Sequence, residues 1–167
     1  PDAVIISVPD HLHKKITIDV INKKKHCLLV KPMTDNLKDG YKMLAAANKA
    51  KVVAEVEFHK RLDESNILLR DKFRKNELGD LLYATIEYSQ RKIIPEKIFK
   101  KWSDKTNVFS YLAVHYVDLI YFITGYLPIS VVAFGQKNYL KSKGINTWDA
   151  IQVIVEWKKS SKGKFIS

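Results

Sequence analysis

The sequence predicts an α/β fold, in which an incomplete parallel sheet is followed by an α+β part with an open, mainly antiparallel sheet. Residues 2–8 form an apolar run, which is typical of an interior strand of a parallel sheet that is covered on both faces. Strand and helix patterns then alternate up to residue 59, which indicates parallel strands joined by right-handed crossovers. Beyond that point the alternation stops. We therefore expect one domain over residues 1–59 and a second over residues 60–167.

Residues 1–59 contain three strand patterns and two helix patterns. The strands are expected at 2–8, 26–30 and 51–58, and the helices at 12–25 and 37–49. Thr34 or Asp35 can cap the second helix. An interior strand needs a hydrogen-bonded neighbour on each side, so the opening strand leads us to expect that this chain is part of a longer protein.

Residues 60–167 contain a different mixture of elements. The helices are expected at 63–75 and 108–124, the strands at 81–88, 130–136 and 148–157, a functional loop at 89–107 and a hairpin-like turn at 160–163. Gly79 and Gly125 are the expected stops of the two helices, because glycine readily adopts the left-handed conformation that ends a helix.

The net charge of +11 is compatible with nucleic-acid binding, which would show as a steep loss of duplex affinity with added salt. However, most of the lysines flank strands or helix ends, where they are solvated edge-blocking or capping residues. Arginine, the usual reader of guanine, occurs only at positions 61, 70, 74 and 91. We therefore expect a solvated basic surface and no nucleic-acid partner.

The single cysteine and the short apolar runs predict where the protein works. Cys27 has no second cysteine with which to form an internal disulfide, which favours a reducing, cytoplasmic setting. No apolar run approaches the roughly 20 residues that cross a bilayer, so no membrane association is expected. His11 and His13 would diverge by about 200 degrees on a helix and cannot chelate one ion, so no metal is expected.

Four short motifs occur in order along the chain. They are Pro9-Asp-His-Leu-His13, Val30-Lys31-Pro32, Asn76-Glu-Leu-Gly79 and a helix that carries His115 and Asp118. Together they resemble the Gfo/Idh/MocA (glucose–fructose oxidoreductase / inositol dehydrogenase) family of sugar oxidoreductases, whose motifs are Pro-Asn-x-x-His, Glu-Lys-Pro, Gly-Glu-Leu-Gly and Asp-x-x-x-His. This chain has Asp10 for the Asn, Val30 for the Glu and Tyr111 for the Asp.

The resemblance implies an oxidoreductase that transfers a hydride between NAD or NADP and a hydroxyl-bearing carbon of a sugar or cyclitol. Residues 1–59 would be the C-terminal half of an NAD(P)-binding Rossmann domain, and residues 60–167 a truncated domain for substrate binding and oligomerisation. The Gly-rich turn that cradles the pyrophosphate is not in the sequence, so this chain alone is expected to be inactive. The open sheet has one face to cover, so a homo-oligomer is expected.

Lys31 lies at the carboxyl end of a predicted parallel strand, where doubly wound folds bind their ligands. An ammonium group there would stabilise an alkoxide that develops on the substrate. The resemblance implies that this lysine contacts the reacting hydroxyl and the nicotinamide ribose. A surface lysine at a strand end is the alternative that the residues alone favour.

His115 lies in an apolar helix pattern, and the resemblance implies that it is the general acid/base. Asp118, three residues on, can accept a hydrogen bond from one ring nitrogen and fix the tautomer. A neutral imidazole near its usual pKa would suit proton abstraction. A purely structural histidine is the alternative. If the functional interpretation holds, Lys31 and His115 face each other across one cleft.

The other site residues are expected around these two. The expected cofactor-binding residues are Val8, Pro9, His13, Lys31 and Pro32. The expected substrate-binding residues are Lys31, Arg61, Trp102, Tyr111, His115 and Asp118. Helix capping by Asp10 and a solvated hinge at 59–61 are alternatives. The missing Glu and the tyrosine at position 111 also leave open a second function, that of a non-catalytic sugar- or partner-binding relative.

Overall fold

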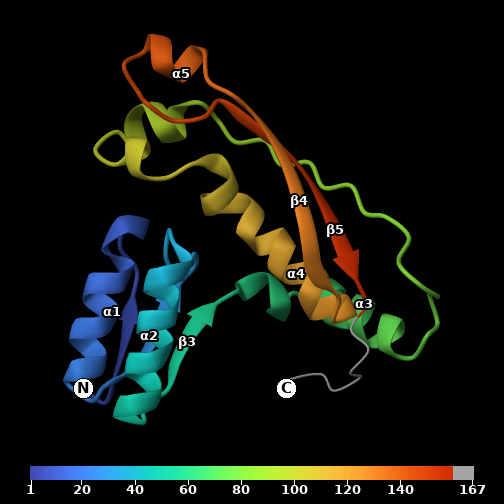
Figure 1. The fold of residues 1–167 in the computed structure, drawn as a ribbon, viewed down its shortest axis with the longest axis horizontal. Helices are drawn as coiled ribbons and strands as arrows, with labels where there is room; N and C mark the ends of the chain where they lie inside the picture. Colours follow the sequence, from blue (N-terminus) through green and yellow to red (C-terminus); the bar gives the residue numbers. More distant parts are fainter. Residues whose placement is uncertain (160–167) are drawn as a thin grey trace.

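The computed structural model describes residues 1–159, which form a three-stranded parallel sheet and a two-stranded antiparallel sheet with helices around them. In Figure 1 the parallel sheet lies at one end of the molecule with α1 (His13–Asn22) and α2 (Leu37–Ala50). Helix α4 (Val114–Thr124) lies between this end and the two-stranded sheet. The predicted α/β architecture is confirmed.

The parallel sheet places three strand ends at one edge. β1 (Ala3–Ile6), β2 (His26–Val30) and β3 (Ala54–Glu57) pair in parallel in the order β1-β2-β3. β3 begins later than predicted because Lys51 adopts the left-handed conformation (φ 56°) that ends α2. The residues that follow each strand, including Lys31, therefore meet at the same edge.

Both helices cover the same face of the parallel sheet. The buried core of this layer consists of Ile6, Ile21, Cys27, Leu29, Met43 and Ala47. Each fully buried side chain of this size contributes about 1.5–3 kcal/mol. On the opposite face Ile5 is 72% exposed, and β1 is an edge strand. Nothing among residues 1–159 packs on that face or pairs with the outer edge of β1, so an interior strand covered on both faces stays a prediction.

Helix α2 is capped by a residue that the sequence interpretation passed over. Asn36 has an extended backbone, and its side-chain oxygen accepts a hydrogen bond from the amide of Asp39 at 2.9 Å. Thr34 and Asp35, the predicted caps, lie before the helix, and Asp35 accepts hydrogen bonds from Thr34 and Asn36 instead. The cap is correct in type but lies one residue later than predicted.

Helix α3 (Glu64–Arg74) ends at an asparagine and not at the predicted glycine. Asn76 adopts the left-handed conformation (φ 58°), and the amide of Glu77 donates to the carbonyl of Lys72 at 3.0 Å. This hydrogen bond is the one that defines a Schellman motif, and it satisfies one of the last carbonyl groups of the helix. Gly79 also has a positive φ, of 70°, but it lies beyond the stop.

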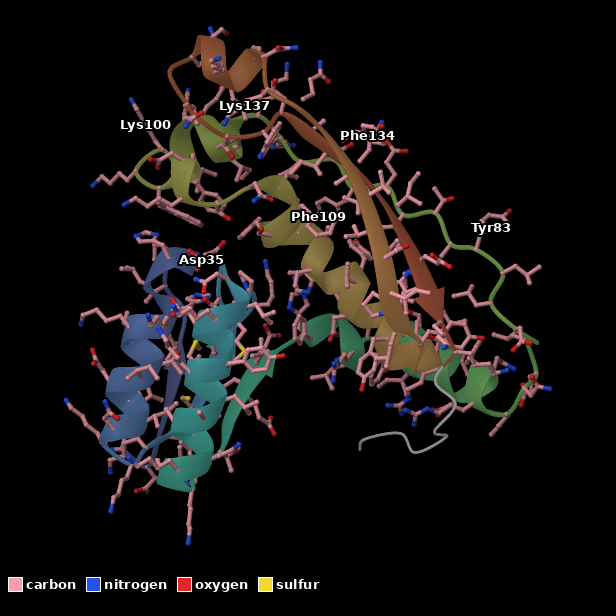
Figure 2. The ribbon with its side chains drawn as sticks, in the orientation of Figure 1. Asp35, Tyr83, Lys100, Phe109, Phe134 and Lys137 are labelled. Atoms are coloured by element: carbon pink, nitrogen blue, oxygen red, sulfur yellow. The ribbon has the colours of Figure 1, made fainter. Side chains whose placement is uncertain are left out.

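The strand predicted at 81–88 does not form. These residues are exposed and join no sheet, and Figure 2 shows Tyr83 on this outlying segment, pointing away from the rest of the chain. Alternating apolar residues make a strand only when a neighbour completes the hydrogen-bond ladder. Within residues 1–159, the two long strands of this half pair with each other alone.

The predicted apolar helix at 108–124 is confirmed, but it opens with a wider turn. Phe109–Ala113 form a π-helical turn, after which α4 runs to Thr124 and ends at Gly125 (φ 71°). Turns of this kind are rare and are frequent at functional sites. The predicted loop at 89–107 contains two short helical turns, Ile94–Ile98 and Ser103–Lys105.

The predicted antiparallel strands are confirmed as β4 (Leu127–Gln136) and β5 (Ala150–Lys158), with α5 (Tyr139–Ser142) in the connection. Every residue of β4 is exposed, so the sheet is open, as expected. The turn predicted at 160–163 lies outside the described residues. Among residues 1–159, no helix has both the length and the apolar character needed to span a bilayer.

Candidate active site

A cavity of about 550 Å³ lies at the edge where the three parallel strands end. Its walls are the segments that follow β1 and β2, the end of β3, the π-helical turn and α4. The lining residues include Val8, Pro9, Asp10, Lys31, Glu57, His59, Trp102, Tyr111 and His115. The structure therefore places Lys31 and His115 at one cavity, as the sequence interpretation required.

Lys31 is buried and directly follows β2. Its ammonium group donates a hydrogen bond to the carbonyl oxygen of Tyr111 and lies 3.8 Å from the centre of that tyrosine ring. Burial lowers the pKa of the amine, and the carboxylates of Asp10 and Glu57 oppose this shift. The amine is held by neutral groups at the cavity wall, where it can stabilise a negative charge that forms on a ligand.

His115 is buried in α4, with its ring packed edge-on against that of His59 at a centroid distance of 4.5 Å. Its enclosed Nδ1 has no hydrogen-bond partner among residues 1–159. Burial, followed by the charges of Lys31 and His59, lowers the pKa of His115 to about 4. The prediction of a pKa near the usual value is therefore wrong. The imidazole is neutral at cellular pH and can accept a proton.

The depressed pKa of His115 makes the folded protein sensitive to acid. Between pH 6.5 and about pH 4 the unfolded chain is protonated at this residue while the folded protein is not, so stability falls as the pH is lowered through this window. We expect a loss of about 2 kcal/mol, because water in the open cavity screens part of the effect. Urea unfolding at pH 7.5 and 4.5 measures it. His115→Gln should show a smaller loss than the wild type, and equal losses would contradict the assignment.

Asp118 does not fix the tautomer of His115, which corrects the sequence prediction. Its carboxylate is bound by the guanidinium of Arg61 through two hydrogen bonds of 2.5 and 2.7 Å. Arg61 lies in the turn after β3 and its guanidinium carbon is 5.4 Å from the ring centres of both Phe58 and Phe122. Both carboxylate oxygens are therefore engaged by Arg61, and the enclosed Nδ1 of His115 has no partner among residues 1–159. Neither Arg61 nor Asp118 lines the cavity.

Replacing Arg61 with methionine is expected to lower the free energy of unfolding by about 2 kcal/mol, because a carboxylate that is 11% exposed loses its partner. This expected loss is below the full cost of an unpaired buried charge because Arg61 is itself 37% exposed. Urea unfolding measures the free energy of unfolding of the variant and of the wild type. The double variant Arg61→Met/Asp118→Asn should recover about half of the loss. Arg70→Met, whose partner Asp71 is exposed, should cost below about 1 kcal/mol. A double variant no more stable than Arg61→Met would contradict the pairing.

The residues predicted to bind the cofactor divide into two groups. Val8 and Pro9 line the cavity beside Lys31. His13 is buried elsewhere, with its ring nitrogens 2.6 Å from the carbonyl oxygen of Pro32 and 2.9 Å from that of Val8. His13 and Pro32 do not line the cavity. Their contact instead fastens the segment after β1 to the segment after β2.

Among the residues predicted to bind substrate, Lys31, Trp102, Tyr111 and His115 line the cavity. Asp10 lines it as well and makes no capping bond to the helix. Its carboxylate accepts a hydrogen bond from the hydroxyl of Thr106 at 2.7 Å. The alternative of a helix cap is therefore wrong, because a residue 96 positions away in the sequence provides its partner.

Sequence reasoning missed several lining residues. Glu57, the last residue of β3, has a carboxylate oxygen 3.1 Å from Nδ1 of His59, and its place at a strand end was the available signal. Tyr88 and Gln90 also line the cavity, but they come from a segment whose local pattern suggested only a strand and a loop. Among residues 1–159, no three His, Cys, Asp or Glu side chains are grouped so as to hold a metal ion.

Two protein-family models match the chain. Residues 1–58 match an oxidoreductase family with an NAD-binding Rossmann fold, and residues 67–167 match the GFO/IDH/MocA C-terminal domain. The chain is 25% identical over 128 residues to glucose-6-phosphate 3-dehydrogenase of Bacillus subtilis, across 73% of this chain and 36% of that protein. It is 26% identical over 136 residues to scyllo-inositol 2-dehydrogenase (NADP(+)) of the same organism, across 79% and 37%.

Solved structures share the fold. An inositol dehydrogenase homolog from Azotobacter vinelandii, complexed with NADH and myo-inositol, superposes with a TM-score of 0.84 at 16% identity, over 94% of this chain and 41% of that one. A myo-inositol 2-dehydrogenase from Lactobacillus plantarum superposes with a TM-score of 0.80 at 19% identity, over 93% and 47%. The chain spans less than half the length of each of these relatives.

Proposed function

Because this chain belongs to the GFO/IDH/MocA oxidoreductase family, we propose that it is part of an NAD(P)-dependent dehydrogenase that oxidises a hydroxyl-bearing carbon of a sugar or cyclitol. The observation that carries the proposal is the single cavity shared by Lys31 and His115 at the carboxyl ends of parallel strands. In this proposal residues 1–59 are half of the cofactor domain, and residues 60–167 are part of the substrate domain.

The residues present fit the reactive end of a nicotinamide cofactor. The loop of Val8 and Pro9 forms one wall of the cavity, and the amine of Lys31 and the ring of His115 lie on the others. The enclosed Nδ1 of His115 has no protein partner among residues 1–159, which is typical of a site that a ligand completes. The Gly-rich turn for the pyrophosphate is not in the sequence, so we assign that part of NAD or NADP to other residues of a longer protein.

We assign the proton chemistry to the chain's own groups. A bound nicotinamide supplies the acceptor for the electron pair of the substrate C–H bond. The ammonium group of Lys31 binds the substrate oxygen and stabilises its negative charge as the O–H bond breaks. Nε2 of neutral His115 takes that proton while the carbonyl forms. The proton then leaves His115 for water in the open cavity, beside the half-exposed His59 and its partner Glu57.

The proposal is tested on the full-length protein with NAD and NADP and a panel of sugars and cyclitols. A change in nicotinamide absorbance with at least one member of the panel is expected. Tyr111, whose ring lies against Lys31 where relatives have an acid, favours a second candidate, the non-catalytic sugar-binding relative. Calorimetric binding of a sugar without turnover of any of them would support that candidate and refute the dehydrogenase.

We also propose that the open sheet pairs with a second copy of the chain. Val132 and Phe134 of β4 and Ile154 of β5 lie on one face of this sheet and are large, apolar and exposed, and Phe134 is labelled in Figure 2. Analytical ultracentrifugation should show a dimer or tetramer, and a monomer at micromolar concentration would oppose this arrangement.

We also propose a cytoplasmic setting, which the free, buried thiol of Cys27 supports.

A further inference from the structure

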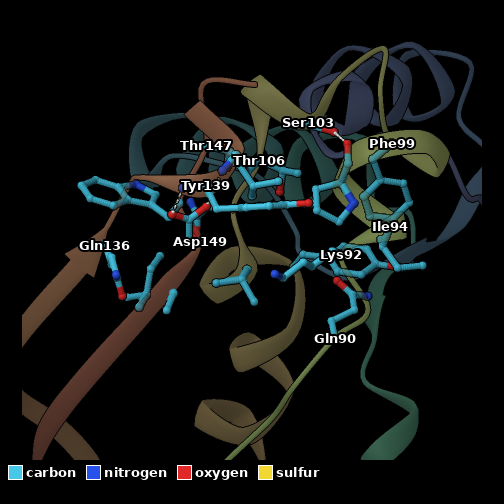
Figure 3. A pocket seen from close by; sticks show the side chains of 18 of the residues that line it. Gln90, Lys92, Ile94, Phe99, Ser103, Thr106, Gln136, Tyr139, Thr147 and Asp149 are labelled. Atoms are coloured by element: carbon cyan, nitrogen blue, oxygen red, sulfur yellow. Dashed lines mark hydrogen bonds between the residues drawn. The ribbon is translucent and has the colours of Figure 1, made fainter. Parts of the chain in front are cut away.

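A second cavity, of about 440 Å³, shares part of its wall with the first. It lies between the segment that follows residue 88 and the ends of β4 and β5 next to α5, and Figure 3 shows it from close by. Four residues, Tyr88, Gln90, Phe99 and Tyr111, line both cavities. The two cavities are therefore neighbours that share these residues, so a ligand with two rings is the kind of molecule that could reach from one to the other.

The walls of the second cavity suit a ring that carries hydroxyl groups. Tyr139 and Trp148 provide aromatic surface, and Figure 3 shows Tyr139 lying across the cavity between Gln136 and Lys92. Gln136 and Asn138, which both carry side-chain amides, line the cavity. An amide both donates and accepts, which matches the two roles of a sugar hydroxyl.

The charged groups of this cavity are largely engaged already. The carboxylate of Asp149 accepts hydrogen bonds from the backbone amides of Asn138, Tyr139 and Leu140. The ammonium group of Lys92 lies 4.1 Å from the centre of the Tyr139 ring. Arg91 lines the cavity as well, so the groups that can recognise a ligand here are a guanidinium, amide side chains and aromatic surface, all of which can bind the hydroxyl groups of a sugar.

The aromatic wall is held in place by the backbone beneath it. A Cβ atom added at Gly135 would lie 2.6 Å from two atoms of the Trp148 ring, so only glycine lets the indole lie against β4. The volume of the cavity falls within the range of small-molecule sites, about 300–1,000 Å³.

We propose that the second cavity binds the second ring of a glycoside whose reacting ring lies in the first cavity, between Lys31 and His115. The substrate is then a disaccharide or a glycosylated cyclitol, and not a free monosaccharide. The proposed dehydrogenase function provides the role of the first cavity in this inference. Tyr111 lines both cavities, so an uncharged residue lies where the two parts of the ligand would join.

The test compares each single ring with its glycoside on the full-length protein: glucose with cellobiose, and myo-inositol with galactinol. Gln136→Ala removes an amide that lines the second cavity alone. It should lower kcat/KM for the glycoside about tenfold, which corresponds to one lost hydrogen bond, and leave kcat/KM for the single ring unchanged. Gln152→Ala is the matched control, because Gln152 lies on β5 opposite Phe134 and lines neither cavity.

The outcomes separate the two proposals. Equal losses on both kinds of substrate, or no loss with Gln136→Ala, would overturn the glycoside site, and so would wild-type turnover that prefers the single rings. Calorimetric titration with cellobiose and galactinol provides a readout without turnover. Binding that Gln136→Ala weakens and Gln152→Ala does not would support the glycoside site even if no substrate were oxidised, in which case the dehydrogenase function alone would fail.

Discussion

Replacing Lys31 with methionine in the full-length protein is expected to lower kcat by about 10²–10³-fold. The ammonium group is a buried positive charge at the cavity wall, and methionine keeps the length of the side chain and its contact with the Tyr111 ring without that charge. Binding of the cofactor should change far less than kcat, because the charge acts mainly on the oxygen that becomes negative during the reaction. Steady-state kinetics at saturating cofactor measure the effect.

The pH dependence offers a check on the same residue. The pKa of Lys31 is lowered from 10.5, so wild-type activity should decline on the alkaline side at a pH below that value, as the amine loses its proton. The methionine variant should lack this decline. Lys15→Met, which removes an exposed lysine from α1, is the matched control and should leave kcat within about twofold. A Lys31→Met enzyme with near-wild-type kcat would remove this lysine from the mechanism.

Replacing His115 with asparagine is expected to lower kcat by about 10²–10⁴-fold, the usual contribution of a general base. The wild-type profile of kcat/KM should have its acidic limb near pH 4, the depressed pKa of the buried imidazole, and not near 6.5. Asparagine keeps a polar group of similar size in the cavity, so the fold should persist. Steady-state kinetics over a range of pH values measure both the loss in kcat and the position of the acidic limb.

A purely structural role for His115 would give a different result. Added imidazole should restore part of the activity of His115→Asn if the cavity, with its volume of about 550 Å³, admits a free base. A variant that loses activity only in proportion to the folded fraction, with no rescue and an unchanged acidic limb, would show that another group takes the proton.

Elements with strong local patterns could be predicted from the sequence. The strand at 26–30 was placed in full because a short apolar run bounded by Lys and Pro needs no distant information. The helix at 108–124 and its stop at Gly125 followed from an apolar pattern that ends at a glycine. Lys31 could be placed at a strand end because the apolar run at 26–30 stops directly before it. Parallel pairing then brings the ends of β1, β2 and β3 to one edge.

Apart from the helix cap at Asn36 and the helix stop at Asn76, the misses concern partners that lie far away in the sequence. The alternating residues at 81–88 read as a strand, but no strand among residues 1–159 pairs with them. Asp118 was paired with His115, its neighbour on the helix, whereas the structure gives it Arg61, which lies 57 positions away. The pKa of His115 depends on burial and on Lys31 and His59, which come from other elements. None of these partners is encoded in the local pattern.

The sequence by itself determined most of the helices and strands, though not the fate of residues 81–88, and which residue types stand at strand ends, because these depend on periodicity and on neighbours within a few positions. Only the tertiary structure decided that two cavities meet at Tyr111, that a carboxylate turns to an arginine, and that an imidazole is neutral. These properties arise from the distance between groups far apart in the chain and from the exclusion of water around them, which only the folded arrangement specifies.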